Sequence, residues 1–182
     1  MKGIVFTEFL EMVDSCMSPE MTEKLIDQCN LPSGGAYTTV GTYDHAEIIA
    51  LVGALSRETG MPVSDLVRAF GAHLFSRFVA LYPKFFEVED LFAFLESIDS
   101  RVHVDVRKLY PDAELPRVEC SRAHDNHLAV HYRSGRAMGD LAEGLISSAI
   151  EHFGEDVALE RQDLSGGAEQ YVRFDLVRRS GS

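Results

Sequence analysis

Apolar residues recur at helical spacing through the first 110 positions of the chain. Intervals of three and four residues between them predict amphipathic helices. Ser18 followed by Pro19 is typical of a helix start, while Asp44 with Glu47 predicts a capping box. We expect helices over residues 1–16, 19–29, 45–59, 64–82 and 88–110, the last as one helix or as two consecutive pieces.

The spacing changes to strict alternation after residue 116, which is typical of half-buried strands. Strands are predicted over residues 117–120, 127–133, 156–161 and 169–177, with a helix over 139–153 between the second and the third. We therefore expect an α+β fold in which a helical N-terminal half packs on a C-terminal four-stranded antiparallel sheet of order β-β-α-β-β. Residues 1–180 are expected to form a single domain, and we interpret the closing residues 181–182 as a cloning remnant.

Composition narrows the class of protein. The 182 residues are 46% hydrophobic and carry a formal net charge of −12, which favours a globular domain and disfavours nucleic acid as a partner. The three cysteines are scattered, so we expect neither a disulfide framework nor a structural zinc. Apolar runs are too short for a membrane span, and Glu8 and Glu11 interrupt any signal-like core. We expect a cytoplasmic protein without a membrane partner.

Side chains that could bind a ligand or a metal occur in two segments of the sequence. Tyr132, Ser134 and Arg136 alternate along an extended segment and should point the same way. An Arg fork and two hydroxyls suit the carboxylates of a flat apolar cofactor, although the exposed end of a strand would show the same pattern. His103 lies at the edge of an apolar helical stripe, where it is either a metal ligand or a packed side chain. A nucleophile with a neighbouring base is lacking, which disfavours an enzyme.

These residues, taken with their surroundings, resemble one family. His103, "LYPDAELP" over 109–116 and "YRSGR" over 132–136 are similar to the heme-nitric oxide/oxygen-binding (H-NOX) family, and the similarity extends over nearly the whole chain. The resemblance implies a heme b in the crevice between the two halves, with His103 as the proximal ligand of a five-coordinate ferrous iron. It also implies that Tyr132, Ser134 and Arg136 bind the heme propionates and that Pro116 presses on the porphyrin and distorts it.

The distal side of the heme determines which gas binds. In O2-binding members a distal tyrosine follows the Y-x-S-x-R motif, and the equivalent position here is Leu141. Because bound O2 needs a hydrogen-bond donor and NO does not, an apolar pocket predicts that the chain binds NO and CO and excludes O2. The other residues expected in the distal pocket are Val5, Phe9, Leu74, Phe78 and Leu145.

The family resemblance also implies a mechanism and a partner. NO bound opposite His103 would weaken the iron–histidine bond, and its cleavage would release the helix that carries His103 and let the heme relax against Pro116. We expect signalling in trans to a histidine kinase or a diguanylate cyclase, without catalysis by this chain.

Three alternatives stay open. A heme-free small-molecule-binding module would use the same crevice, and an O2-binding member of the family would differ only at the distal side. A heme enzyme such as a peroxidase would need a polar distal acid or base. The nearby His73 precedes Leu74 and is expected at the surface or behind the pocket. The cysteine and histidine cluster that binds zinc or responds to oxidation in some bacterial relatives has no counterpart here.

Overall fold

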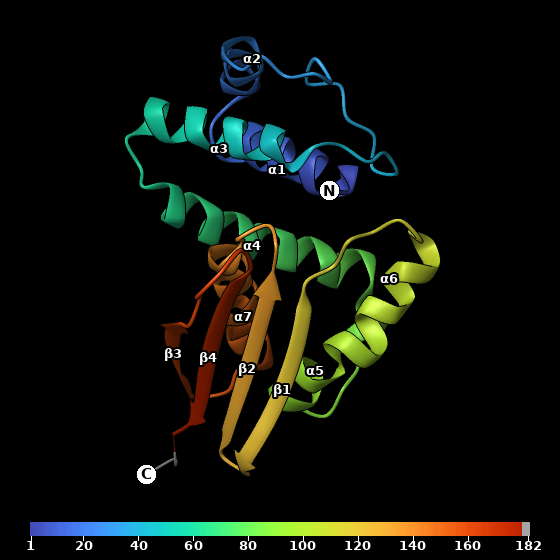
Figure 1. Ribbon diagram of the computed structural model, residues 1–182, viewed down its shortest axis with the longest axis vertical. Coiled ribbons are helices and arrows are strands. Elements are labelled where there is room, and N and C mark those ends of the chain that lie inside the picture. The colour runs from blue at the N-terminus through green and yellow to red at the C-terminus, as the bar shows by residue number, and fades with distance from the viewer. Residues whose placement is uncertain (180–182) are drawn as a thin grey trace.

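The computed structural model describes residues 1–179, so the pair at 181–182 lies outside the described part (Figure 1). Its N-terminal half is helical, as predicted. The longer helices there are α1 (Gly3–Cys16), α2 (Pro19–Gln28), α3 (His45–Thr59) and α4 (Val63–Leu81), and the single 3-10 turn η1 (Pro83–Phe85) follows.

The predicted caps of α2 and α3 are confirmed in part. The Ser18 hydroxyl accepts a hydrogen bond from the Met21 N–H at 3.3 Å, and the Asp44 carboxylate accepts one from the Ala46 N–H at 2.9 Å. The capping box is wrong at Glu47, because this buried carboxylate accepts hydrogen bonds from the Ser33 and Tyr37 hydroxyls instead. Its burial fixes the loop before α3 onto that helix.

The C-terminal half is the predicted antiparallel sheet. Its elements are β1 (Arg117–His124), β2 (His127–Ser134), α7 (Gly139–Phe153), β3 (Val157–Asp163) and β4 (Gln170–Arg178). The strands lie in the order β1-β2-β4-β3, and every neighbouring pair is antiparallel. This confirms the expected α+β architecture.

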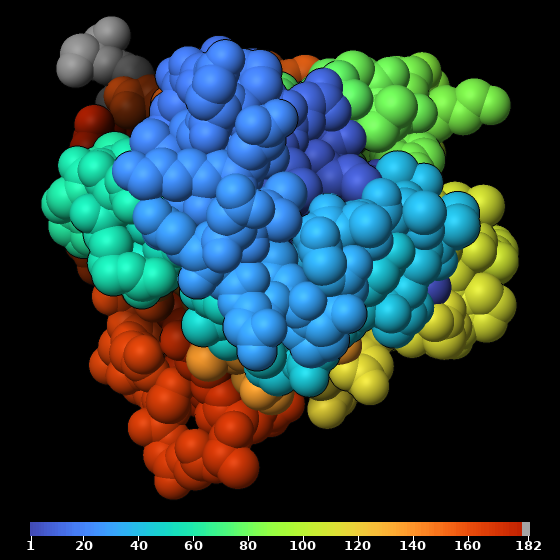
Figure 2. Space-filling model, turned by 90° about the horizontal axis from the view of Figure 1, so that it is seen from above, coloured from blue at the N-terminus to red at the C-terminus, as the bar shows by residue number. Residues whose placement is uncertain are grey.

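The elements form three layers (Figure 1). Helices α1 to α3 lie farthest from the sheet, α4 crosses between them and the sheet, and α7 covers one sheet face. Viewed from above, α2 and the loop after it cover much of the outer face (Figure 2). The core accordingly has two parts, one among the N-terminal helices and one between the sheet, α5 (Leu91–Ser97) and α7. Leu145 packs against both parts.

Helices α4 and α7 meet at two glycines. A Cβ atom on Gly144 would lie 2.2 Å from the carbonyl oxygen of Arg68, and one on Gly71 would lie 2.6 Å from the carbonyl oxygen of Leu141. The two backbones therefore touch, and a side chain at either position would force them apart.

Across residues 1–179, each helix is either too short or too polar to cross a lipid bilayer.

Candidate functional site

The segment predicted as a helix over 88–110 is interrupted in its middle. It consists of α5, a π turn η2 (Ile98–Val102) and α6 (His103–Leu109). The His103 N–H donates to the carbonyl oxygen of Ile98, five residues earlier, and His103 is the first residue of α6. Single π turns inside helices are frequent at functional sites because they redirect the side chains that follow.

The His103 side chain is largely buried and has a carboxylate partner. Its Nδ1 atom lies 2.6 Å from Oδ1 of Asp99, and the side chain is 12% exposed. Burial lowers the pKa of His103, whereas the hydrogen bond and charge of Asp99 raise it. Because burial has the larger effect, the ring is neutral at neutral pH and keeps one nitrogen lone pair.

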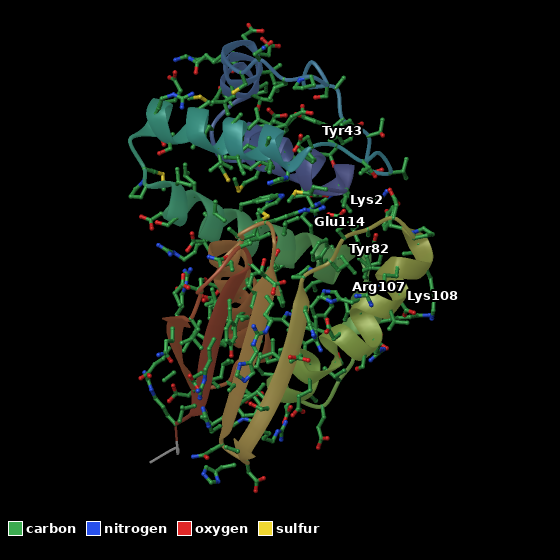
Figure 3. All side chains as sticks on the ribbon, viewed as in Figure 1. Lys2, Tyr43, Tyr82, Arg107, Lys108 and Glu114 are labelled. Carbon is green, nitrogen blue, oxygen red and sulfur yellow. The ribbon has the colours of Figure 1, made fainter. Side chains whose placement is uncertain are left out.

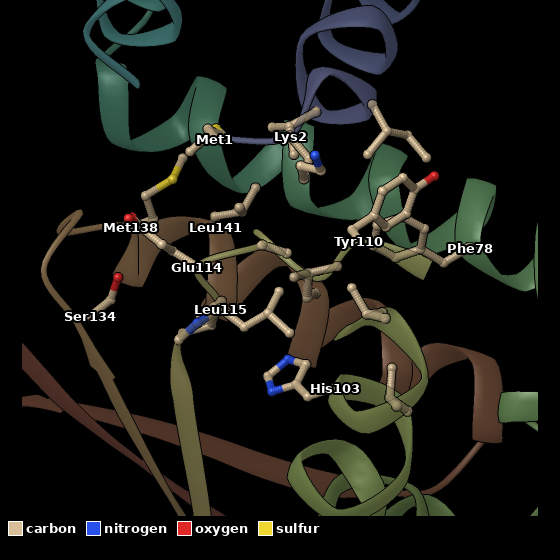
Figure 4. Close-up of a pocket in the computed structure, with 18 of the residues that line it drawn as sticks. Met1, Lys2, Phe78, His103, Tyr110, Glu114, Leu115, Ser134, Met138 and Leu141 are labelled. Atoms are coloured by element: carbon tan, nitrogen blue, oxygen red, sulfur yellow. The ribbon is translucent and has the colours of Figure 1, made fainter. Parts of the chain in front are cut away.

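His103 forms part of the wall of a cavity of about 280 Å3 between the two halves of the molecule. The imidazole points from α6 into this space, with Leu115 above it and Ser134 and Phe78 to either side (Figure 4). Residues of α1, α4, α6, β2 and α7 complete the wall, together with the loop between α6 and β1.

A second cavity of about 180 Å3 adjoins the first. The two share His103 and a set of apolar or aromatic neighbours: Phe78, Tyr82, Phe85, Val102, Val106 and Leu145. Beyond them the second cavity is enclosed mainly by phenylalanine and aliphatic side chains, including Phe75, Phe86, Phe94 and Leu95. Together they form a slot with one polar end and one apolar end, and His103 lies between the ends.

Tyr132, Ser134 and Arg136 meet at the polar end, although not by the expected alternation. Strand β2 ends at Ser134, and the Ser134 hydroxyl accepts a hydrogen bond from the Arg136 N–H at 3.1 Å, which closes a turn. All three line the cavity, and burial raises the pKa of Tyr132. The Arg136 guanidinium donates to the carbonyl oxygen of Glu114 at 3.0 Å and pairs with the Glu114 carboxylate. This arginine is thus already directed at carboxylate oxygens.

The residues expected near the gas divide into two groups. Pro116 lines the cavity, and so do Val5, Phe78, Leu141 and Leu145. Phe9 and Leu74 instead lie in the core of the helical half, where the Phe9 ring packs edge-on against Phe70 with centroids 5.3 Å apart. An apolar helical stripe predicts burial, but it does not distinguish the part that faces a cavity from the part that faces another helix.

Several lining residues were not anticipated from the sequence. Tyr82 and Phe85 flank the helix stop at Pro83, and Tyr110 follows α6 in the "LYPDAELP" segment. The one signal in the sequence that could have indicated them is their position at or just after the end of a helix. His73 lies behind the lining, where its Nε2 atom is 3.2 Å from the Glu8 carboxylate. This agrees with the expectation of a position behind the pocket.

The residues of the slot suit one kind of prosthetic group. A flat apolar body with carboxylates on one edge matches a slot with an arginine and two hydroxyls at one end and aromatic side chains at the other. A neutral imidazole in the wall supplies a ligand for a metal at the centre of such a body. The residues of the cavity thus fit the class of proteins that hold a flat, carboxylate-bearing, metal-centred prosthetic group.

Comparison with known proteins specifies the class further. A family model described as Haem-NO-binding matches residues 2–161, and the chain belongs to this family, whose members are heme-based gas-sensing domains. A structure of the Fe(II) unliganded H-NOX protein from K. algicida is 36% identical, with a TM-score of 0.91 over 100% of this chain and 98% of that one.

Two further solved structures are similar. The H-NOX from Shewanella woodyi, bound to IWP-051 in the Fe(II)CO ligation state, is 40% identical, with a TM-score of 0.83 over 98% of this chain and 95% of that one. The H-NOX protein from S. oneidensis in the Fe(II)NO ligation state is 25% identical, with a TM-score of 0.84 over 97% and 99%. A search of curated protein sequences gave no match.

Proposed function

We propose that this chain, as one domain over residues 1–180, senses NO through a heme b whose ferrous iron is held by His103. The supporting observation is a neutral, buried histidine in the wall of a slot with an arginine and hydroxyls at one end. The heme, when bound, supplies an iron that takes a diatomic gas as ligand. The relatives from S. oneidensis and Shewanella woodyi, solved in NO and CO states, support NO and CO as ligands.

The chain's own residues would have separate roles in this site. His103 would hold the iron, Tyr132, Ser134 and Arg136 would hold the propionates, and Pro116 would press on the porphyrin. When NO binds, His103 would leave the iron and free α6 from the position that the bond imposes. A partner that binds one of the two positions better than the other would receive the signal. We propose that this partner is a histidine kinase or a diguanylate cyclase in the cytoplasm, and that the chain itself catalyses no reaction.

Apolar residues around the cavity support selection against O2. Val5, Phe78, Leu141 and Leu145 offer no donor to a polar bound gas. A second candidate, an O2-binding member of the family, is favoured by the hydroxyls of Tyr82 and Tyr110, which also line the cavity. The two candidates differ in whether either hydroxyl reaches the gas.

Absorption spectra of the heme-loaded protein distinguish these candidates. The protein is reduced without oxygen and then exposed in turn to CO, NO and air. We expect five-coordinate ferrous heme, binding of CO and NO, and no binding of O2. Stable O2 binding that is lost in Tyr82→Phe or Tyr110→Phe would establish the second candidate instead, and a protein that takes up no heme would contradict both.

The proposed switch depends on His103. His103→Gly, with free imidazole supplied as a replacement ligand, should still bind heme and NO, but NO should no longer change the activity of the partner. The measurement is partner activity with and without NO for both proteins. Regulation that survives in His103→Gly would contradict release of α6 as the signal.

The proposed selectivity depends on Leu141. Leu141→Tyr places a hydroxyl at the position where O2-binding members carry a distal tyrosine, so we expect it to gain O2 binding in air. Leu141→Phe is the matched control, since it adds a ring of similar size without the hydroxyl. Equal O2 binding by the two variants would contradict a requirement for a donor.

A further inference from the structure

We propose that Asp99 is a positioning residue that determines which nitrogen of His103 faces the cavity and how strongly that nitrogen donates to iron. The inference rests on the proposed function, because it assumes that His103 holds the heme iron. It concerns a residue outside the cavity lining, which acts on the heme only through His103.

The contact is short and spans the π turn. Oδ1 of Asp99 lies 2.6 Å from Nδ1 of His103, four residues later. Side chains four residues apart lie on the same face of a helix, one turn from each other. Asp99 lies within the turn over Ile98–Val102 and His103 directly follows it, so the carboxylate and the imidazole meet across this turn.

The contact determines the tautomer. A neutral imidazole carries one N–H, and a carboxylate can only accept, so Nδ1 carries the proton and donates it to Asp99. The lone pair then stays on Nε2, the nitrogen available to the cavity. Asp99 is 35% exposed and His103 12% exposed, so the contact is screened from water mainly on the histidine side.

The contact also affects ligand strength. A carboxylate that accepts the second N–H of a metal-bound histidine raises the basicity of the ligating nitrogen and fixes the plane of the ring. More negative charge at the ligand stabilises ferric over ferrous iron. Asp99 should accordingly lower the reduction potential of the heme and strengthen the bond that NO must break. The charge of Arg107 acts in the opposite direction, because it lowers the pKa of His103 whereas Asp99 raises it.

The first experiment measures the tautomer before and after heme loading. Nitrogen-15 NMR of the purified chain should show the proton of His103 on Nδ1, and the reduced CO-loaded protein should show the same proton far downfield. In Asp99→Asn that resonance should move upfield, and in Asp99→Ala the proton should move to Nε2 in the heme-free chain. A proton on Nε2 in the unsubstituted heme-free chain would overturn the inference.

The second experiment measures the reduction potential of the loaded protein. Asp99→Asn keeps a hydrogen-bond acceptor but removes the charge, so we expect a positive shift in potential and a lower iron–histidine stretching frequency. Asp105→Asn is the matched control, because Asp105 lies on α6 two residues after His103 and pairs with Lys108 at 2.7 Å. Equal potentials in Asp99→Asn and the unsubstituted protein would overturn the inference.

The outcomes separate the two proposals. If the chain takes up no heme, the proposed function fails and the tautomer measured in the heme-free chain still tests Asp99. If heme, CO and NO bind as expected and neither the tautomer nor the potential responds to Asp99, only the inference fails.

Discussion

Arg136 is paired with a carboxylate in the structure, and the proposed role of this residue would require an exchange of partners. The Glu114 side chain that it contacts is 83% exposed. An ion pair so open to water contributes about 0–1 kcal/mol, so a better placed carboxylate can displace it. The Arg136 side chain itself is mostly buried against the cavity, which keeps it directed at the polar end of the slot.

Removal of this guanidinium should weaken heme binding. A charge-assisted hydrogen bond contributes about 1.5–3 kcal/mol, so Arg136→Ala is expected to lower heme affinity on the order of ten- to a hundred-fold. Competition for heme with an apo-globin measures the change. Arg122→Ala is the control, since Arg122 makes its hydrogen bonds to Glu96, at 3.0 and 2.9 Å, away from the cavity. Equal losses in both variants would show that the effect is not specific to the slot.

A buried acid joins α1 to α4. Glu8 is 5% exposed and accepts a hydrogen bond from Nε of Arg77 at 2.8 Å, with His73 as a second neighbour. The contact raises the pKa of Arg77. Because α1 carries Val5 and α4 carries Phe78, this pair fixes two walls of the cavity relative to each other.

The contribution of this pair can be measured against a neighbouring one. Glu8→Gln should lower the free energy of unfolding by about 1–3 kcal/mol, because a buried partner of a charged group is lost. Glu11→Gln on the same helix should cost less than about 0.5 kcal/mol, because Glu11 is 54% exposed and lies 3.6 Å from the same arginine. Urea denaturation of both variants gives the two values. A larger loss in Glu11→Gln would contradict the importance of the buried contact.

The first residues of the chain are joined to the loop that follows α6, more than a hundred residues later. Nζ of Lys2, labelled in Figure 3, donates to the carboxylate of Asp112 at 2.8 Å and to the Thr42 hydroxyl at 2.8 Å. Thr42 in turn donates to Asp112 at 2.7 Å. The contact connects Lys2, which lines the cavity, to the segment between α6 and β1 that carries Pro116.

This contact predicts a pH dependence of stability. The hydrogen bonds from Lys2 and Thr42 lower the pKa of Asp112 from its ordinary value of 3.8 to about 2. Since the unfolded chain binds the proton more tightly, the contact stabilises the fold fully above about pH 5 and progressively less as pH falls through 4 toward 2. Between about pH 5 and pH 3 the free energy of unfolding should therefore fall more steeply in the unsubstituted protein than in Asp112→Asn.

Chemical denaturation across that pH range, with Asp105→Asn as the control for loss of a surface carboxylate, tests this. If the free energy of unfolding falls equally with pH in the unsubstituted protein and in Asp112→Asn, the contact does not stabilise the fold.

The sequence predicted the helices and strands well where local signals determine them. The cap at Ser18 and the helix stop before Pro83 depend on neighbouring residues, and the structure has both. Strand β2 forms as predicted, but its burial does not alternate, because Ala129 is buried along with Leu128 and Val130. The π turn before His103 could not be anticipated, because a helical stripe looks the same whether one turn contains an extra residue or not. Glu47 was predicted to cap α3 from its spacing to Asp44. Its actual burial depends on the loop before α3, whose Tyr37 hydroxyl donates to it, and this contact cannot be predicted from neighbouring residues.

Some residues of the candidate site could be predicted from the sequence and others could not. His103, Tyr132, Ser134 and Arg136 were found because their types and spacing resemble a family, and the structure brings them to one cavity. Phe9 and Leu74 lie in the helical core and not in the cavity wall, whereas Tyr82 and Tyr110 line the cavity without having been anticipated. The direction of these side chains depends on tertiary packing, which a local pattern does not contain. Roles in binding heme or gas stay predictions for all of these residues.

The contact between the α4 and α7 backbones limits how the cavity can adapt to a guest. Phe78 projects from one of these helices and Leu141 and Leu145 from the other, so this wall cannot widen unless the two helices separate at Gly71 and Gly144. The wall formed by α6 differs, because α6 begins directly after a π turn. One added methyl group at either glycine would push these two helices apart, so it would change the shape of the cavity although neither glycine lines it.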